Sequence, residues 1–274
     1  MKNLLLALCG LICSFNLMAT STKKTVTVFT TVYPPYVVQN SDGSQDGVSL
    51  DILRVVFGEI GYQVNFEIAP YRRTVKNLFS SENHIMMGMF VGIPNYQSIE
   101  ATEVTYMVFP TTYFYNHQKN PQYAEIKSLK QTTGKMVSIM GGTGFYENVI
   151  KESGGILAKV SNEVQVLSMV KKGRVDFGHT GNLTGLDRIK QNKAFAVVRP
   201  LDFNVTEIKS GLVFRKGAFA IRDKFIKKIE ELHKNGRMKK IYGHSLRDLP
   251  LANPAHLVPD AIGVNHNTPK AKAR

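Results

Sequence analysis

Three side chains near the start of the chain have the chemistry to hold a small polar solute. Tyr33 and Tyr36 follow directly after an alternating apolar run, and Arg73 lies further along the chain. A tyrosine ring stacks on a planar or cationic group. The planar guanidinium of an arginine matches the geometry of a carboxylate or a phosphate. We therefore predict aromatic walls at Tyr33 and Tyr36 and an anion clamp at Arg73.

The second half of the chain supplies further candidates. Thr143 and Gly144 end a Gly-Gly-Thr-Gly turn at the point where a strand passes into a helix. Free backbone N–H groups and the helix dipole bind anions at such a junction. His179 and Asn182 follow another strand and are predicted to line the edge of this second unit. Asp176, which precedes them, is interpreted as a structural residue.

The elements that must position these residues alternate between strand and helix. Alternation and β-branched composition predict strands over 25–33, 62–69, 85–91, 136–139, 194–198 and 211–214, with another starting at 175. Helical spacing and capping signals predict helices over 52–57, 72–79, 145–151, 166–170 and 222–234. Ser49 or Asp51 is predicted to cap the first of these, and Asn162 with Gln165 is predicted to cap the helix over 166–170. This order favours parallel sheets with helices on their faces.

The two α/β units are predicted to be joined around residues 113–118 and again near 205–211. Two such units suggest two lobes with a cleft between them, and ligand pockets favour domain interfaces. The chain has 11 prolines, of which four lie in the last 25 residues. Because that segment also lacks helical spacing, we expect a draped or disordered tail.

Several catalytic and metal-binding classes lack their motifs. The only two cysteines are Cys9 and Cys13, which excludes a disulfide scaffold, a cysteine-based zinc site and an iron–sulfur cluster in the body of the protein. The seven histidines show no His-Glu-x-x-His spacing. A Gly-x-Ser-x-Gly turn and a Gly-Lys-Ser/Thr phosphate loop are also absent. We predict no catalytic residue, no metal and no cofactor.

Charge and composition point first to anionic partners. The 274 residues are 43% hydrophobic and 20% charged, which is typical of a globular protein, and the net charge is +14. Residues 1–19 contain Lys2, a short apolar run and Ala19, the layout of a cleaved secretory signal peptide. Cleavage after Ser21, a lipid anchor on a cysteine and an uncleaved anchor are alternatives. An exported protein rarely meets nucleic acid, so we predict no nucleic-acid partner.

A set of motifs, taken in order, resembles one known family. The motifs are Thr31-Val-Tyr-Pro-Pro-Tyr36, Asp46-Gly-Val-Ser-Leu-Asp51, Gly61-Tyr62, Gly141-Gly-Thr-Gly144, Gly173-Arg-Val-Asp176, Gly211-Leu-Val-Phe-Arg-Lys216 and Phe225…Leu232…Asn235-Gly236…Ile241-Tyr242. Over about residues 25–245 they resemble the bacterial extracellular solute-binding proteins of family 3, the polar-amino-acid receptors of ABC importers. The resemblance implies a type II periplasmic binding protein fold, with two α/β lobes, a ligand cleft and a two-strand hinge. Lobe 1 would comprise 22–115 plus 210–248, lobe 2 would comprise 116–209, and 249–274 would form the tail.

The resemblance also implies a function and a set of contacts. It implies a periplasmic monomer that captures a small, carboxylate-bearing solute and presents it to an ABC permease or a membrane sensor. Tyr71 stands where the family often has a tryptophan. The complete predicted ligand-binding set is Tyr33, Tyr36, Tyr71, Arg73, Met89, Phe90, Thr143, Gly144, His179 and Asn182.

Two departures from the family pattern concern the amino-acid anchors. No arginine follows Gly88-Met89, where the family holds an α-carboxylate, and Gly181 stands where the family has an aspartate for the α-ammonium. An ordinary α-amino acid is therefore only one of the ligands that we consider. The alternative functions are a sensing module that acts with a partner in trans and an exported cyclohexadienyl-dehydratase-like enzyme. That enzyme would use Glu103 or Asp202 as its acid group.

Overall fold

The computed structural model describes residues 24–89, 98–141, 144–249, 257–259 and 262–267. Its strands are β1 (Lys24–Thr30), β2 (Val38–Gln39), β3 (Gln45–Asp46), β4 (Tyr62–Ile68), β5 (Ile85–Met89), β6 (Ala101–Asn116), β7 (Met136–Met140), β8 (Ile156–Val160), β9 (Phe177–Gly181), β10 (Val198–Pro200), β11 (Thr206–Arg215) and β12 (Gly263–Asn267). Its α-helices are α2 (Val48–Glu59), α3 (Tyr71–Ser80), α4 (Gly144–Glu152), α5 (Glu163–Lys172), α6 (Asn182–Gln191), α7 (Phe219–Lys234) and α8 (Arg237–Ser245). Short 3₁₀ turns cover Pro121–Glu125, Leu129–Thr132, Lys193–Phe195 and Lys216–Ala218.

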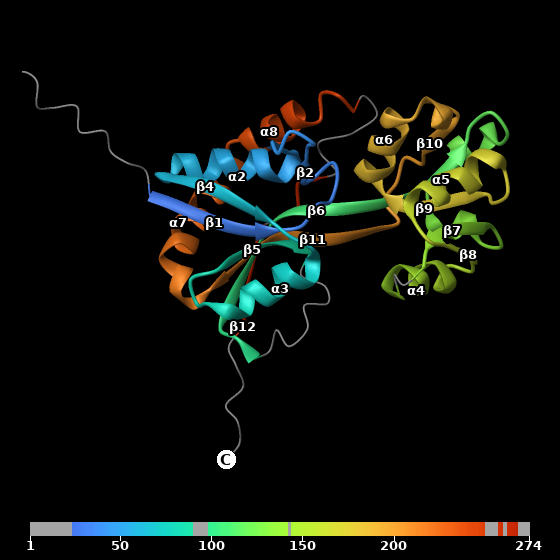
Figure 1. Ribbon diagram of the computed structural model, residues 1–274. Coiled ribbons are helices and arrows are strands. Elements are labelled where there is room, and N and C mark those ends of the chain that lie inside the picture. The colour runs from blue at the N-terminus through green and yellow to red at the C-terminus, as the bar shows by residue number, and fades with distance from the viewer. Residues whose placement is uncertain (1–23, 90–97, 142–143, 250–256, 260–261, 268–274) are drawn as a thin grey trace, which may run out of the picture.

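Figure 1 shows two groups of elements joined by β6 and β11. Lobe 1 contains β1, β4, β5, β12, most of β11 and the first part of β6. In lobe 1 the order β1-α2-β4-α3-β5 runs as predicted, and β1 pairs in parallel with both β4 and β5. Helices α2, α7 and α8 pack against one another, and the rings of Phe57 and Phe214 each lie 5.4 Å from that of Phe225 in the core.

Lobe 2 contains β7, β8, β9, β10 and the helices α4, α5 and α6. Strand β7 pairs in parallel with β8 and β9, as an alternating α/β sequence requires. The Asn162 side chain accepts a hydrogen bond of 3.0 Å from Gln165 N and so caps α5, and Gly173 ends that helix in the left-handed region at φ 68°. Both signals were predicted from the sequence.

Strand β6 belongs to both lobes because its partner changes along its length. It pairs antiparallel with β11 as far as Thr111, and with β9 from Thr111 to Phe114. Thr206, the first residue of β11, lies opposite Thr111. The sheet therefore passes from one lobe to the other without a break, and two neighbouring strands carry the connection.

Several predicted elements differ from the observed ones. Helix α2 begins at Val48 with Gly47 as its N-cap residue and no side-chain cap, so the prediction of Ser49 or Asp51 as the cap is wrong. The chain turns there at φ 123°, and a Cβ on Gly47 would lie 2.5 Å from Tyr36 O. Only glycine fits this close approach, and the turn therefore sets where the helix begins.

The predicted strand over 194–198 is also wrong. Residues 193–195 form a 3₁₀ turn in which Asn192 Oδ1 accepts a hydrogen bond from Ala194 N, and β10 starts only at Val198. Phe195 is buried in that turn, so its apolar character reflects packing and not a strand. The strand predicted from 25 to 33 ends at Thr30, and the one predicted from 175 begins at Phe177.

The C-terminal segment adds a strand to lobe 1. Strand β12 pairs antiparallel with β6 along Ala101–Thr105, so this part of the tail is draped on the sheet. The predicted signal peptide lies outside the described residues. No helix in the described part of the chain has the length and apolar character needed to cross a bilayer.

Candidate functional site

A cavity of about 150 Å³ opens where the two lobes meet. It lies at the carboxyl ends of the parallel strands β7 and β9, the edge at which open α/β sheets place ligands. Its lining residues are Tyr33, Thr111, Ile139, Met140, Tyr146, Glu163, His179, Thr180 and Gly181. Lobe 1 contributes Tyr33, the crossover contributes Thr111, and lobe 2 contributes the rest.

Tyr33 is held in place by aromatic packing. Its ring stacks on Tyr36 with centroids 5.6 Å apart and an interplanar angle of 10°, and it tilts against Phe109 at 5.7 Å. The same loop reaches lobe 2, because Thr184 Oγ1 donates a 3.3 Å hydrogen bond to Pro34 O. Burial raises the pKa of Tyr33, and the negative charge of Glu163 raises it further. Tyr33 therefore presents a neutral, fixed ring to the cavity.

His179 is neutral in this site. Its side chain is buried, and Nε2 shares a 2.9 Å hydrogen bond with Thr111 Oγ1 at the crossover of β6. Burial lowers the pKa of His179 to about 3, because the charged imidazolium would lose its hydration. The ring also tilts against Tyr146 with centroids 5.0 Å apart. His179 consequently offers a polar but uncharged surface.

Among the described residues of the lining, Glu163 is the one that carries a charge. It is the first residue of α5, where the helix dipole favours a carboxylate, and its Oε1 accepts a 3.1 Å hydrogen bond from Thr180 Oγ1. Burial raises the pKa of Glu163, while the hydrogen bond from Thr180 and the charge of Arg188 act in the opposite direction. The site therefore combines one partly buried carboxylate with tyrosine rings, hydroxyl groups and a neutral imidazole.

Of the predicted site residues, Tyr33 and His179 line this cavity. Asn182 is the first residue of α6, directly after the lining residue Gly181, and is buried. Tyr36 is fully buried behind Tyr33 and belongs to the core of lobe 1. Burial raises the pKa of Tyr36 well above its usual value.

The remaining candidates do not line the cavity or lie outside the described residues. Arg73 is exposed on α3 and does not line the cavity. Tyr71 is the first residue of α3, and Met89 is the last residue of β5. Gly144 is the first residue of α4, in agreement with the strand-to-helix junction predicted there. Phe90 and Thr143 lie outside the described residues.

Several lining residues were not predicted from the sequence, among them Thr111, Tyr146 and Glu163. Glu163 has a local signal, because it directly follows the helix cap Asn162 at a strand-to-helix junction. Because the preceding strand β8 was not predicted, the sequence did not indicate a strand-to-helix site at this junction. Thr111 lies within the 16-residue strand β6, which sequence reasoning did not predict either.

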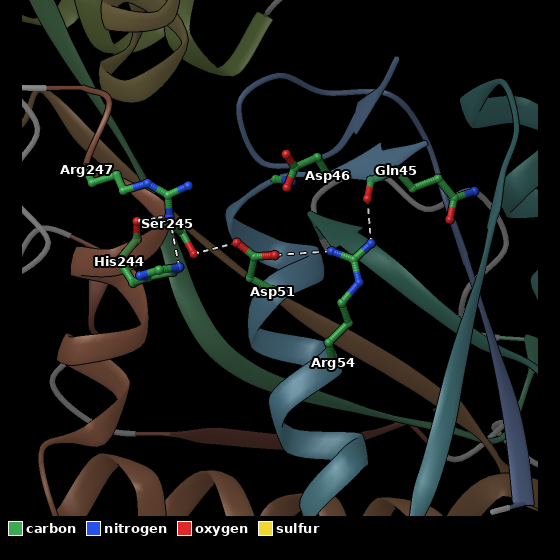
Figure 2. A network of polar contacts seen from close by, with 8 residues as sticks. Gln45, Asp46, Asp51, Arg54, His244, Ser245 and Arg247 are labelled. Atoms are coloured by element: carbon green, nitrogen blue, oxygen red, sulfur yellow. Dashed lines mark hydrogen bonds and ion pairs between the residues drawn. The ribbon is translucent and has the colours of Figure 1, made fainter. Parts of the chain in front are cut away.

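A second, larger hollow of about 440 Å³ lies between α2 and α8 on lobe 1. Figure 2 shows that several of its polar groups bond to one another or to neighbouring residues. Asp51 accepts hydrogen bonds from Arg54 Nη1 at 3.1 Å and from Ser245 Oγ at 2.7 Å, and Arg54 Nη2 donates to Gln45 O. The Asp51 carboxylate already has Arg54 as its cation, whereas Glu163 forms no ion pair with any of the described residues.

Asp176 has a structural role, and its replacement gives a test. Its carboxylate accepts 2.5 Å and 2.9 Å hydrogen bonds from Tyr123 Oη and Met136 N, which tie β9 to β7 and to the preceding turn. Asp176→Ala should lower the free energy of unfolding by about 2 kcal/mol, because two hydrogen bonds to a charged group are lost. Asp202→Ala is the control, since that exposed residue makes only a 3.6 Å surface ion pair with Lys127. Equal denaturation midpoints for the two variants would contradict this role.

The two α/β lobes, their two-strand connection and the cavity between them define a type II periplasmic binding protein fold. The chain belongs to the bacterial extracellular solute-binding proteins of family 3, whose family model matches residues 26–246. Within the described residues, no group of three His, Cys, Asp or Glu side chains is arranged to hold a metal ion. No curated protein matches the sequence.

Solved structures show the same fold at low sequence identity. The unliganded open L-cystine solute receptor of Neisseria gonorrhoeae is 22% identical, with a TM-score of 0.66 over 85% of this chain and 96% of that one. An ancestral arginine-binding protein bound to arginine is 23% identical, with a TM-score of 0.57 over 81% and 97%. A histidine kinase sensor domain is 16% identical, with a TM-score of 0.57 over 82% and 97%.

Proposed function

We propose that the protein binds a small polar solute between its lobes and carries no catalytic activity. The observation that carries this proposal is the interlobe cavity, in which Tyr33 from lobe 1 faces Glu163 and His179 from lobe 2. The lobes, with the boundaries predicted from the sequence, close on the solute about β6 and β11. Closure is favoured because the closed state makes contacts with the solute that the open state lacks.

A thermal-shift screen of amino acids, amines and carboxylates tests solute binding. A ligand that binds only the folded protein stabilises it by about 2.7 kcal/mol at a hundred times its dissociation constant, which raises the melting temperature. Mass spectrometry of small molecules that co-purify with the native protein identifies the solute directly. A native protein that carries no solute and responds to none of these compounds would contradict the proposal.

We propose that the protein is a monomer that is exported by means of its N-terminal signal peptide. Its proposed partner is an ABC importer in the membrane. The likeness to a histidine kinase sensor domain favours sensing as the second candidate. A strain from which the gene has been deleted distinguishes import from sensing. Loss of uptake of the identified solute supports import, whereas intact uptake with a lost transcriptional response supports sensing.

The dehydratase-like alternative receives no support from the residues predicted to serve it. Glu103 lies in the lobe 1 part of β6 and accepts a 3.1 Å hydrogen bond from Asn265 on β12. Asp202 is highly exposed. Neither residue lines the cavity.

Arg73 remains our proposed partner for a carboxylate of the solute. It lies in the first turn of α3, which follows β4. This turn is near the edge of the lobe 1 sheet at which the parallel strands β1 and β4 end. We expect Arg73→Ala to weaken binding at least tenfold, because an arginine–carboxylate pair stabilises a complex by more than about 1.4 kcal/mol. Calorimetry with the identified solute measures the change. Lys76→Ala, an exposed cation on the same helix, should leave the affinity unchanged. Wild-type affinity in the Arg73 variant would remove it from the site.

A further inference from the structure

We infer that one basic face of lobe 1 binds the surface of a membrane that contains anionic phospholipids. This face, which we call the α8 face, consists of Arg237, Lys239, Lys240, His244 and Arg247, and all five side chains are exposed. None of them lines the interlobe cavity. The inference therefore goes beyond solute binding and does not depend on which solute the cavity takes.

The first argument is the location of the positive charge. The net charge of the chain is +14, but the described lining of the interlobe cavity includes no lysine or arginine. Residues 237–247 contain four lysines and arginines and no aspartate or glutamate. A surface that carries one sign of charge attracts the opposite sign, so the α8 face favours an anionic partner.

The helix geometry collects these cations on the solvent side. Arg237, Lys240 and His244 follow one another at steps of three and four residues, which places them along one side of α8. The opposite side carries the buried residues of the helix, and α8 packs there against α2 and α7. Figure 1 shows α8 beside α2 on the outside of lobe 1. Arg247 extends the row just past the helix end, where its Nη1 lies 2.9 Å from His244 Nε2.

The second argument is that three of these cations have no counter-charge within the described part of the chain. Arg237 Nη2 donates to Glu59 Oε1, so its charge is compensated. Lys239, Lys240 and Arg247 form no ion pair with any described residue. Water solvates each of them at little cost, but three uncompensated cations within eleven residues raise the local positive potential.

The neighbouring elements do not cancel this potential. The acidic residues of α2 and of the turn after α8 already have basic partners: Asp51 has Arg54, Glu59 has Arg237 and Lys228, and Asp248 has Lys190. Helix α7 contains five lysines and arginines and three carboxylates, so it adds positive charge. The positive field of the α8 face therefore reaches the solvent.

The third argument is the surface between α2 and α8. The hollow of about 440 Å³ there is lined by the basic side chains of Arg54, Lys240 and His244 and by the aliphatic side chains of Val55 and Ile241. A phospholipid headgroup region has the complementary composition, because it presents an anionic phosphate next to aliphatic carbon. Basic pockets of this kind bind lipid headgroups.

The types of cation favour a membrane over an acidic protein. Arg54 and Arg237 are already engaged with carboxylates of α2, and two of the three uncompensated cations are lysines. A lysine is a mobile point charge that can follow phosphates as they diffuse in a fluid bilayer. Specific docking of protein carboxylates would favour free arginine forks instead.

Vesicle flotation tests the inference with the mature protein. Its partition is measured with vesicles of phosphatidylcholine alone and with vesicles of equal parts phosphatidylcholine and phosphatidylglycerol. We expect the protein to float with the mixed vesicles and not with the neutral ones. Because salt screens the attraction, binding should fall at least tenfold between about 0.05 M and about 0.5 M salt.

A triple variant locates the binding surface. The α8-face variant combines Lys239→Gln, Lys240→Gln and Arg247→Gln, and its partition onto the mixed vesicles should fall at least tenfold. The matched control removes the same three charges from exposed positions of lobe 2 that have no ion pair with a described residue. Its substitutions are Lys130→Gln, Lys151→Gln and Arg174→Gln. The control should bind the vesicles nearly as well as the wild type.

The outcomes separate this inference from the proposed function. Equal partition of the wild type and the α8-face variant, or equal binding to neutral and mixed vesicles, would overturn the inference. A wild type that stays in solution with the mixed vesicles at low salt would also overturn it, and an acidic protein would then be the partner to which the charge points. Calorimetry with the solute is unaffected by these outcomes, because the α8 face does not line the cavity.

Discussion

Gly211→Ala should lower the free energy of unfolding by about 3 kcal/mol or more, because the new methyl group has no space. Gly211 lies where the register between β11 and β6 shifts, at the step from Ser210. A Cβ at this position would lie 1.9 Å from Val104 O and 3.0 Å from Thr105 Cα. These neighbours are backbone atoms of β6 and cannot move without breaking the pairing of the two strands.

Urea denaturation of the ligand-free protein measures this effect. The matched control is Gly58→Ala, because Gly58 lies in α2 with no atom within 4 Å of its added Cβ. The control should be neutral or stabilising by up to about 1 kcal/mol, since alanine is the better helix former. Similar midpoints for the two variants would show that the close approach of β11 to β6 is relieved in solution. A large difference would establish that the two strands connecting the lobes are in tight contact there.

His179→Gln should make the protein less sensitive to acid. The pKa of His179 is about 3 in the folded state and near its usual value of 6.5 in the unfolded chain. The unfolded state therefore binds one more proton between these values. The wild type loses stability as the pH falls through this window, by about 1.4 kcal/mol per pH unit. Between about pH 6 and pH 4 the variant should lose about 2–3 kcal/mol less than the wild type.

Denaturation midpoints at several pH values test this expectation. Glutamine retains a polar group for Thr111 Oγ1, so the variant isolates the titration from the loss of the hydrogen bond. Glu163 titrates with the opposite sign in the same range, but it is present in both proteins and cancels in the comparison. His244→Gln serves as the control, because that histidine is exposed on α8. Parallel stability curves for wild type and His179→Gln would contradict the buried, neutral state of His179.

The two strongest predictions concern the same part of the fold. Gly211 and Thr111, the partner of His179, both lie on the strands that connect the lobes, and His179 also lines the cavity. The hydrogen bond between His179 and Thr111 therefore joins a residue that lines the cavity to the strand that connects the lobes.

Local signals in the sequence predicted much of the fold. The alternation at β1 and β4, the cap Asn162 and the stop at Gly173 act over a few residues, and all four were recognised. The ordered motifs also led to the family that the chain matches. Tyr33 and His179 were predicted as site residues because they follow strand ends, where an α/β fold places its ligands.

The tertiary structure alone decided the remaining features. The length of β6 and the pairing of β12 depend on partners far away in the sequence, so no local period indicates them. Tyr33 and Tyr36 flank the same pair of prolines, and only the tertiary packing decides that Tyr36 is fully buried while Tyr33 lines the cavity. The surroundings of Glu163 come from the loop after β1 and from β9, α4 and α6 together, and that assembly decides that Glu163 forms no ion pair among the described residues. The sequence determined the fold family and the strand ends that carry the site, whereas long-range packing determined the charge inside the cavity.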